Sequence, residues 1–294
     1  MNDTAPDAAP DCAPPQRGPR APSERLPEGA CDCHFHVFGD RKRYPLDPRR
    51  NYTPHVATLD DHRAVMAACG IERAVLVQPS VYGTDNACLL DALREAAKEG
   101  DAYRGIVVPD AALSDDELLA MDALGVRGIR LNVVNPQMLA IDDAVALCER
   151  MRSRNWHLQV HLMLGGDGAT TLAQLADRVD GPIVVDHFGR PAAGAALPRL
   201  VLDLVASGRV WVKLSAAYRI ARPGRSNDDI RPLVDALVAA NPERLLWGSD
   251  WPHTELQADV PNDADLVDLL VATLPDAATL RRVCVDNPAS LYGF

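Results

Sequence analysis

Short apolar, β-branched segments alternate with segments of helical periodicity from Gly29 to the end of the chain. The apolar segments, expected to be strands, are 31–37, 73–79, 103–109, 128–132, 157–163, 182–187, 210–215 and 245–251. The amphipathic segments, expected to be helices, are 59–69, 85–99, 115–124, 140–154, 171–179, 197–207, 228–240 and 263–273. Eight successive strand–helix units predict an α/β fold, a single (β/α)8 TIM barrel spanning residues 29–294.

The competing architecture is a doubly wound open sheet. Such sheets usually carry a glycine-rich phosphate-binding turn after the first strand, and the sequence HVFGDRKRYP at 36–45 contains no such turn. The polar segment 39–58 is therefore expected to be the first loop at the mouth of the barrel. Thr58, Asp85 and Ser114 stand just before helical segments and suit N-cap positions.

The first 28 residues contain seven prolines and almost no large apolar side chain. A segment of this composition buries too little surface to offset its chain entropy, so we expect residues 1–28 to be a disordered tail. It lacks the apolar stretch of a secretory signal peptide.

Composition limits the partners of the chain. The sequence is 47% hydrophobic and 24% charged, with a net charge of −11, which argues against nucleic acid or an anionic membrane as partner. Its apolar runs are far shorter than the roughly 20 residues of a membrane span. The seven cysteines lack framework spacing and suit reduced thiols in the cytoplasm. The oligomeric state stays open, with a homodimer as one possibility.

Polar residues gather late in the predicted strands, where a TIM barrel carries its active site. They are His34, His36, Gln78, Arg130, Asn132, His161, His187, Lys213, Ser215 and Asp250. Charge at a strand end inside a barrel is costly without a partner or a ligand. This repeated placement therefore indicates a functional site.

The first predicted strand, CDCHFHV, combines cysteines and histidines that could bind a metal. Side chains alternate along a strand, which places Asp32, His34 and His36 on one face. We expect that face to line the barrel. Cys31, Cys33 and Phe35 are then expected to pack in the layer between strands and helices. Two histidines spaced two residues apart on one strand can converge on one metal ion.

The constellation resembles the amidohydrolase superfamily, in which strand one carries His-x-His, strands five and six each end in histidine and strand eight ends in aspartate. The closer signatures DCHFHVFG, YTP, VQPSVYGTDN, GVRGIRLN, VKLS and GSDWPH are similar to the 2-pyrone-4,6-dicarboxylate lactonases. They are equally similar to galactarolactone isomerases, sulfomuconolactone hydrolases and sugar lactonases. This resemblance covers about 265 residues and implies an enzyme, a lactonase that opens the ring of a small acidic lactone.

The resemblance assigns catalytic roles. Asp250 is the expected base that activates water. His187, His34 and His36 are expected to polarise the carbonyl oxygen, directly or through a metal. The fourth predicted strand offers Arg130 and not the bridging lysine of binuclear relatives. The expected cofactor is therefore one divalent ion, Zn²⁺, on His34, His36, His161 and Asp250. The alternative is catalysis without metal, which the pyrone-dicarboxylate lactonases use.

Substrate binding is expected to depend on arginine, whose planar fork matches carboxylate geometry. Arg130 and Arg219 are the leading candidates, while Lys213 is expected either to pair with Asp186 or Asp250 or to touch substrate. Tyr82, Asn86 and His253 complete the expected substrate-binding set. The stretch VVNPQ after the fourth strand lacks the arginine that the dicarboxylate lactonases carry there. This difference favours another or less charged lactone.

Four functions remain open at this stage. The first is a lactone hydrolase, and the second is a lactone isomerase that uses the same base. The third is a metal-dependent decarboxylase or hydratase. The fourth, a binding barrel without catalysis, does not require an aspartate beside several histidines.

Overall fold

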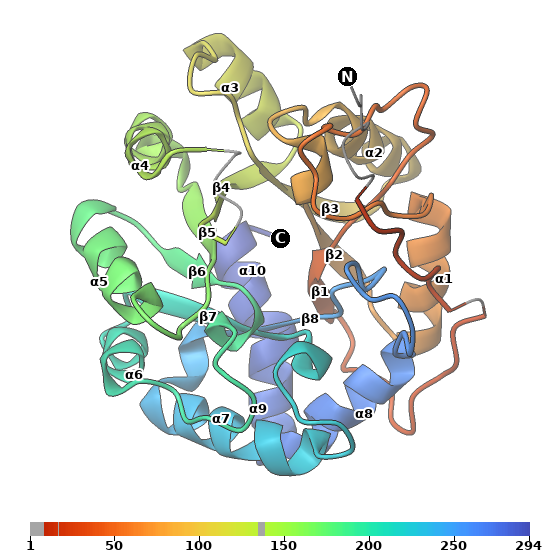
Figure 1. Ribbon diagram of the computed structural model, residues 1–294, viewed down its shortest axis with the longest axis vertical. Coiled ribbons are helices and arrows are strands. Elements are labelled where there is room, and N and C mark those ends of the chain that lie inside the picture. Colours follow the sequence, from red (N-terminus) through yellow and green to blue (C-terminus); the bar gives the residue numbers. More distant parts are fainter. Residues whose placement is uncertain (1–8, 17, 135–138) are drawn as a thin grey trace, which may run out of the picture.

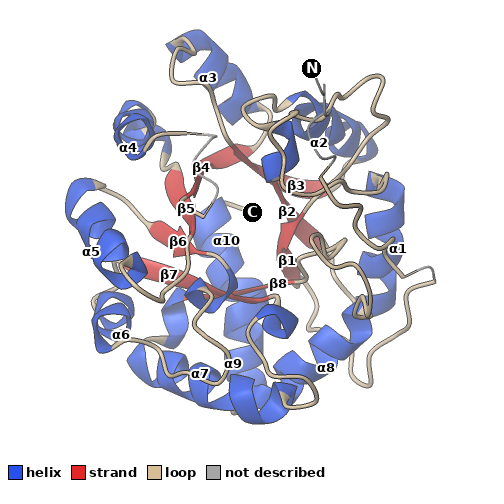
Figure 2. Cartoon of the chain, viewed as in Figure 1, coloured by secondary structure: helices blue, strands red, loops and turns tan. Residues whose placement is uncertain are grey.

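A computed structural model describes residues 9–16, 18–134 and 139–294. Within these residues, eight strands pair in parallel in the order β1 to β8 and enclose a barrel surrounded by helices (Figures 1 and 2). The strands are β1 Cys31–Phe35, β2 Arg73–Val77, β3 Ala102–Val107, β4 Val126–Asn132, β5 His157–His161, β6 Ile183–Val185, β7 Val210–Ser215 and β8 Leu245–Gly248. Each overlaps a predicted strand, so the predicted TIM barrel is confirmed.

The helices follow the strands around the barrel (Figure 1). They are α1 Leu59–Cys69, α2 Ala87–Glu99, α3 Asp115–Ala123, α4 Ile141–Arg150, α5 Gly168–Arg178, α6 Arg199–Ala206, α7 Ser226–Ala240 and α8 Asp263–Thr273, then α9 Ala277–Arg281 and α10 Asn287–Tyr292. Thr58 and Ser114 form capping boxes at α1 and α3 as expected. The N-cap of α2 is Asn86, one residue after the expected Asp85. The short helices α9 and α10 were not predicted.

The barrel closes where β1 meets the end of β8. The Asp250 N–H donates to the His34 carbonyl at 2.8 Å, and the His36 N–H donates to the Trp251 carbonyl at 2.8 Å. A parallel bridge joins Phe35 to Trp251. Closure therefore takes place at the same residues that carry the predicted catalytic side chains.

A β-bulge in β1 overturns part of the predicted side-chain alternation. Asp32 pairs with Ala74 and Phe35 with Leu76, so two residues of β1 lie opposite one residue of β2. Cys33 and His34 consequently both face the barrel interior. Asp32 faces the opposite way, toward α1, where its carboxylate bonds the His62 ring.

The expectation that Asp32 lines the barrel is therefore wrong, as is the placement of the two cysteines behind the strand. Cys31 and Cys33 pack at the base of the barrel with Val75, Val77 and Tyr292 of α10. Strict alternation holds only for an unbroken ladder, and the bulge shifts the pattern by one residue. Within the bulge, the His34 N–H donates to the Asp32 carboxylate at 3.0 Å, which satisfies this buried backbone group.

The N-terminal segment also differs from expectation. Residues 9–16 and 18–28 lie against the barrel, with Cys12 and Leu26 buried. The Leu26 N–H donates to the Cys69 carbonyl at 3.1 Å, and Ser23 bonds Asp268. The expected disorder does not hold for these residues, because hydrogen bonds and the buried Cys12, Pro22 and Leu26 attach the proline-rich chain to the barrel surface. Residues 1–8 and 17 lie outside the described part of the chain.

Membrane crossing has no support in the described residues, since none of their helices combines the length and the apolar character that a span requires.

Gly248 at the end of β8 leaves room for His34. A methyl group at Gly248 would lie 2.6 Å from the His34 Cβ and 2.8 Å from its backbone N. We expect Gly248→Ala to lower the free energy of unfolding by about 1–3 kcal/mol because it overpacks the closed barrel. Urea denaturation measures the change. Gly165→Ala, where no atom lies within 4 Å of the added carbon, is the control, and equal stability of the two variants would contradict the steric argument.

Candidate active site

A polar cavity of about 330 Å³ opens at the carboxyl ends of the strands. Its lining residues are His36, Tyr52, Ser80, Arg130, Asn132, His161, His187, Arg219, Asp250, Thr254 and Glu255. Six of the predicted site residues are among them. This end of the barrel is where TIM-barrel enzymes place their chemistry.

Three histidine nitrogens surround one oxygen of Asp250. The Oδ1 atom lies 3.6 Å from the His34 Nε2, 3.8 Å from the His36 Nε2 and 3.6 Å from the His187 Nε2. All four side chains are buried. His187 and Asp250 also have positive φ angles of 54° and 65°, a backbone conformation that costs energy in residues other than glycine and often marks functional sites.

The other oxygen of Asp250 is held by two donors. The Tyr218 hydroxyl donates to Oδ2 at 2.7 Å, and the Arg219 Nε donates to the same atom at 3.0 Å. Arg219 also donates to the Thr254 carbonyl and to the Glu255 carboxylate. These contacts fix the carboxylate and leave its Oδ1 directed at the histidines.

The outer contacts of the histidines determine where their hydrogens lie. The His36 Nδ1 is 2.7 Å from the Val77 carbonyl, which only accepts, so Nδ1 carries the hydrogen and Nε2 carries a lone pair. The His34 Nδ1 is 3.2 Å from the Asp186 carboxylate and 3.4 Å from the Lys213 Nζ. The nearer, negatively charged carboxylate favours hydrogen on Nδ1 here too. Both Nε2 atoms then face Asp250 as acceptors.

Burial governs the ionisation of these groups. It lowers the pKa of His34 to about 4 and the pKa of both His36 and His187 to about 3. Burial alone would raise the pKa of Asp250, but His187 and Arg219 hold it well below its usual range. Near neutral pH the centre therefore consists of neutral imidazoles around an ionised carboxylate.

This donor set fits a single metal ion. Within the described residues, the ligand atoms of His34, His36 and Asp250 all lie within 4.8 Å of one another, as do those of His34, Asp186 and His187. The His34 Nε2 is buried and has no hydrogen-bond partner. Lone pairs that converge on a carboxylate repel one another, and a cation would relieve that repulsion.

His161 stands apart from the other expected metal ligands. It belongs to neither of the two groups that could hold an ion. Its Nε2 lies 3.3 Å from Arg190 Nη1 and accepts from that guanidinium. The lone pair that a metal would need is therefore already engaged, although the residue still lines the cavity.

Arg130 has the position expected of a substrate arginine. Its Nη1 donates to the Gln78 carbonyl at 2.7 Å, and its Nη2 lies 3.6 Å from the Asp186 Oδ2. The buried Nε has no hydrogen-bond partner. An anionic group in the cavity could satisfy this N–H.

Four other predicted substrate residues do not line the cavity. Lys213 is fully buried and donates to Gln159 at 2.6 Å, with Asp186 3.6 Å away. The Tyr82 hydroxyl accepts from the Gly39 N–H, and the Asn86 side chain bonds the backbone of Val108. His253 contacts Tyr218 and Asp263. Each of the four side chains thus contacts other protein groups, and a substrate-binding role for them stays a prediction.

Several residues that line the polar cavity were not predicted from the sequence. Tyr52, Thr254 and Glu255 come from loops and stand in no periodic pattern that would mark them. Ser80 follows β2. Tyr218, which bonds Asp250 from outside the cavity lining, was not predicted either. Part of the VVNPQ stretch, residues 135–137, lies outside the described residues.

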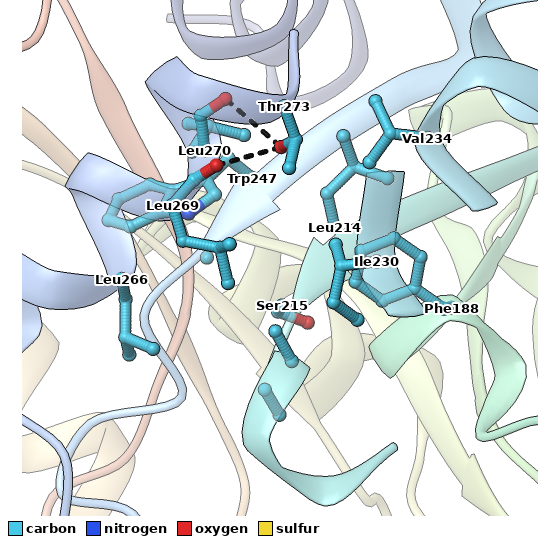
Figure 3. Close-up of a pocket in the computed structure, with 13 residues that line it drawn as sticks. Phe188, Leu214, Ser215, Ile230, Val234, Trp247, Leu266, Leu269, Leu270 and Thr273 are labelled. Atoms are coloured by element: carbon cyan, nitrogen blue, oxygen red, sulfur yellow. Dashed lines mark hydrogen bonds between the residues drawn. The ribbon is translucent and has the colours of Figure 1, made fainter. Parts of the chain in front are cut away.

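A second cavity of about 330 Å³ lies between β7, β8 and the helices α7 and α8 (Figure 3). Its lining includes Leu214, Ile230, Trp247 and Leu270 and contains no charged side chain. This lining has no charged side chain for an acidic ligand, whereas Arg130 and Arg219 line the polar cavity.

Comparisons with known proteins identify relatives of this chain. The family model described as amidohydrolase matches residues 31–294. A 4-sulfomuconolactone hydrolase from Rhizobium radiobacter is 38% identical over 95% of this chain and 96% of its own. A D-galactarolactone isomerase from Agrobacterium fabrum is 28% identical over 92% of this chain and 94% of its own.

Among solved structures, a probable 2-pyrone-4,6-dicarboxylic acid hydrolase from Acinetobacter baumannii, with citric acid bound, superposes with a TM-score of 0.80. It is 25% identical and covers 90% of this chain and 100% of its own. The family model spans nearly all of the barrel. This chain is therefore an enzyme that belongs to the amidohydrolase family.

Proposed function

We propose that the enzyme hydrolyses a small lactone that bears a carboxylate or sulfonate group. The observation that carries this proposal is the buried Asp250, whose Oδ1 faces three histidines while its Oδ2 is held by Tyr218 and Arg219. Two arginines lie at the same cavity and suit an anionic substituent. The 38% identical relative that is named for a sulfonated lactone supports this substrate class.

Asp250 is the proposed base. Its ionised Oδ1 would take a proton from water as the water oxygen attacks the lactone carbonyl carbon. When the ring C–O bond breaks, the same carboxyl group would return that proton to the leaving oxygen. Net consumption of one water gives the open-chain acid.

The proposed roles of the other side chains follow from their donors. Arg130 would bind the acidic substituent through its unpartnered Nε. Arg219, which also lines the cavity, would help to bind that substituent while its Nε keeps Asp250 oriented. His36 presents an acceptor at Nε2 and therefore has no hydrogen to donate to a carbonyl oxygen. Direct polarisation by His36 is thus disfavoured, and the arrangement favours a bound cation.

We propose that this cation is one Zn²⁺ ion held by His34, His36 and Asp250, whose atoms match the ligand types zinc prefers. When bound, it would supply Lewis-acid polarisation of the carbonyl. His34 is fixed by Asp186, and His36 by the Val77 carbonyl, as orienting partners usually fix metal ligands.

The second candidate is lactone isomerisation, favoured by the galactarolactone isomerase relative. There, Asp250 would take the proton of a substrate hydroxyl in place of water. Product analysis separates the two, since hydrolysis yields a free acid and isomerisation yields a new lactone.

Asp250→Asn should lower kcat/KM on the best acidic lactone by at least about a thousandfold because the base is lost. A panel of muconolactones, aldarolactones and pyrone dicarboxylate identifies that substrate by ring opening. Asp235→Asn, on the exposed face of α7, is the matched control. Turnover near the wild-type rate in Asp250→Asn would refute the proposed base.

The pH dependence of kcat/KM should be flat from about pH 6 to 9. The histidines are already neutral in this range, since burial lowers the pKa of His34 to about 4. As the pH falls through that value, the imidazole gains a proton and loses its acceptor, so activity should fall. Initial rates measured on a lactone that does not titrate in this range test this. An acid limb near pH 6.5 would show that an ordinary histidine controls the rate.

Protein purified without added metal should contain about one equivalent of zinc per chain. His36→Ala should lose most of it, whereas the exposed His55→Ala should retain it. Elemental analysis gives the content directly. Less than about 0.1 equivalent in the wild type would exclude the zinc proposal and leave metal-free catalysis.

A further inference from the structure

Residues 9–16, here called the N-terminal strap, lie along two loops at the barrel mouth. On one side the strap follows the loop between β1 and α1. The Cys12 N–H donates to the Thr53 carbonyl at 2.9 Å, and the Thr53 N–H donates to the Pro10 carbonyl at 2.8 Å. The Thr53 hydroxyl also donates to the Ala9 carbonyl at 2.9 Å. These bonds form a short parallel bridge between the strap and the loop.

On its other side the strap bonds the loop between β8 and α8. The Ala13 N–H donates to the Leu256 carbonyl at 2.7 Å, and the Glu255 N–H donates to the Cys12 Sγ at 3.3 Å. Gln16 continues this contact by donating to the Val260 carbonyl at 2.6 Å. The strap therefore connects two loops that come from opposite ends of the chain.

Both loops contribute directly to the active-site cavity. Tyr52 adjoins the strap-bonded Thr53, while Thr254 and Glu255 adjoin the strap-bonded Leu256. The second loop also holds Arg219, which donates to the Thr254 carbonyl at 2.7 Å and to the Glu255 carboxylate at 3.0 Å. Arg219 in turn donates to Asp250. A continuous path of contacts thus leads from the strap to the proposed base.

We propose that the N-terminal strap is a positioning element of the active site, which fixes Tyr52, Glu255 and the Arg219 guanidinium for binding of an acidic lactone. The inference rests on the proposed function, because it names what the positioned arginine serves. Without the strap the backbone groups of Leu256 and Thr53 would exchange these partners for water, and both loops would gain conformational freedom. Small displacements of positioning groups reduce catalytic efficiency strongly.

The test uses the full-length chain with Ala13→Pro, which removes the N–H that bonds Leu256. Ala21→Pro is the matched control, since Ala21 also precedes a proline but lies where the chain runs beside α8. We expect Ala13→Pro to raise KM for the acidic lactone about tenfold with kcat changed less than about threefold. The KM of a neutral lactone should change less than about threefold, because such a lactone has no acidic group for the guanidinium to bind. Asp250 itself is also held by the Tyr218 hydroxyl, so kcat should be largely kept.

Amide hydrogen exchange gives a second readout that does not depend on turnover. Exchange in 52–56 and 254–258 should become faster in Ala13→Pro, while the barrel strands and the control stay unchanged. If exchange in these loops is unaltered, or if acidic and neutral lactones lose activity equally, the positioning role is wrong. If the wild type turns over no lactone but Ala13→Pro loosens both loops, the proposed function fails and the positioning of the loops stands.

Ala13→Pro could impair folding, so Cys12→Ala provides an independent variant. It removes the sulfur that accepts the Glu255 N–H and keeps every backbone bond of the strap. We expect Cys12→Ala also to raise KM for the acidic lactone, but only about threefold. Wild-type KM values for both lactone classes, with normal strap-loop exchange, would overturn the proposal.

Discussion

The Asp32 carboxylate holds the barrel closed at the point where the site forms. Its Oδ1 accepts the N–H groups of His34 and Ser249, and its Oδ2 accepts from the Ser249 hydroxyl and from the His62 ring. Burial alone would raise the pKa of Asp32, but the contacts with His62, Ser249 and His34 together outweigh burial and lower the pKa. Bonds to a buried charge contribute about 1.5–3 kcal/mol each. One side chain thus fixes both the bulge that carries His34 and the turn that carries Asp250.

Charge inside the barrel is balanced below the cavity. Asp186 is fully buried, and Lys213, Arg130 and His34 all approach it. Burial alone would raise its pKa, whereas His34 and Lys213 hold it well below the usual range. Removing one member of such a set leaves an uncompensated buried charge, a cost of several kcal/mol. Of the two alternatives expected for Lys213, the structure shows the pairing with Asp186, which also lies beside His34.

Periodicity was sufficient to predict the eight strand–helix units and the strand ends at which the histidines and Asp250 lie. Periodicity did not predict features that depend on contacts between residues far apart in the sequence. The bulge at Cys33 and His34 arises from pairing with β2 and from Asp32, which alternation does not encode. The prediction for the strap was wrong for a similar reason. Its composition predicts disorder, but its order comes from hydrogen bonds to loops about 40 and 240 positions away in the chain. Metal ligation of His161 was expected from family likeness, but Arg190 now competes for its lone pair.

The bond between Asp32 and Ser249 also has a consequence for how the molecule is made. It joins residues 217 positions apart, so nearly all of the chain must be synthesised before the first and last strands can meet. Contacts of such sequence separation form slowly because loop entropy must be lost first. His34 and Asp250 therefore cannot come together until β8 has been synthesised and has reached β1. Until β8 pairs with β1, the histidines of β1 and the Asp250 turn after β8 are not neighbours, and the active site is incomplete.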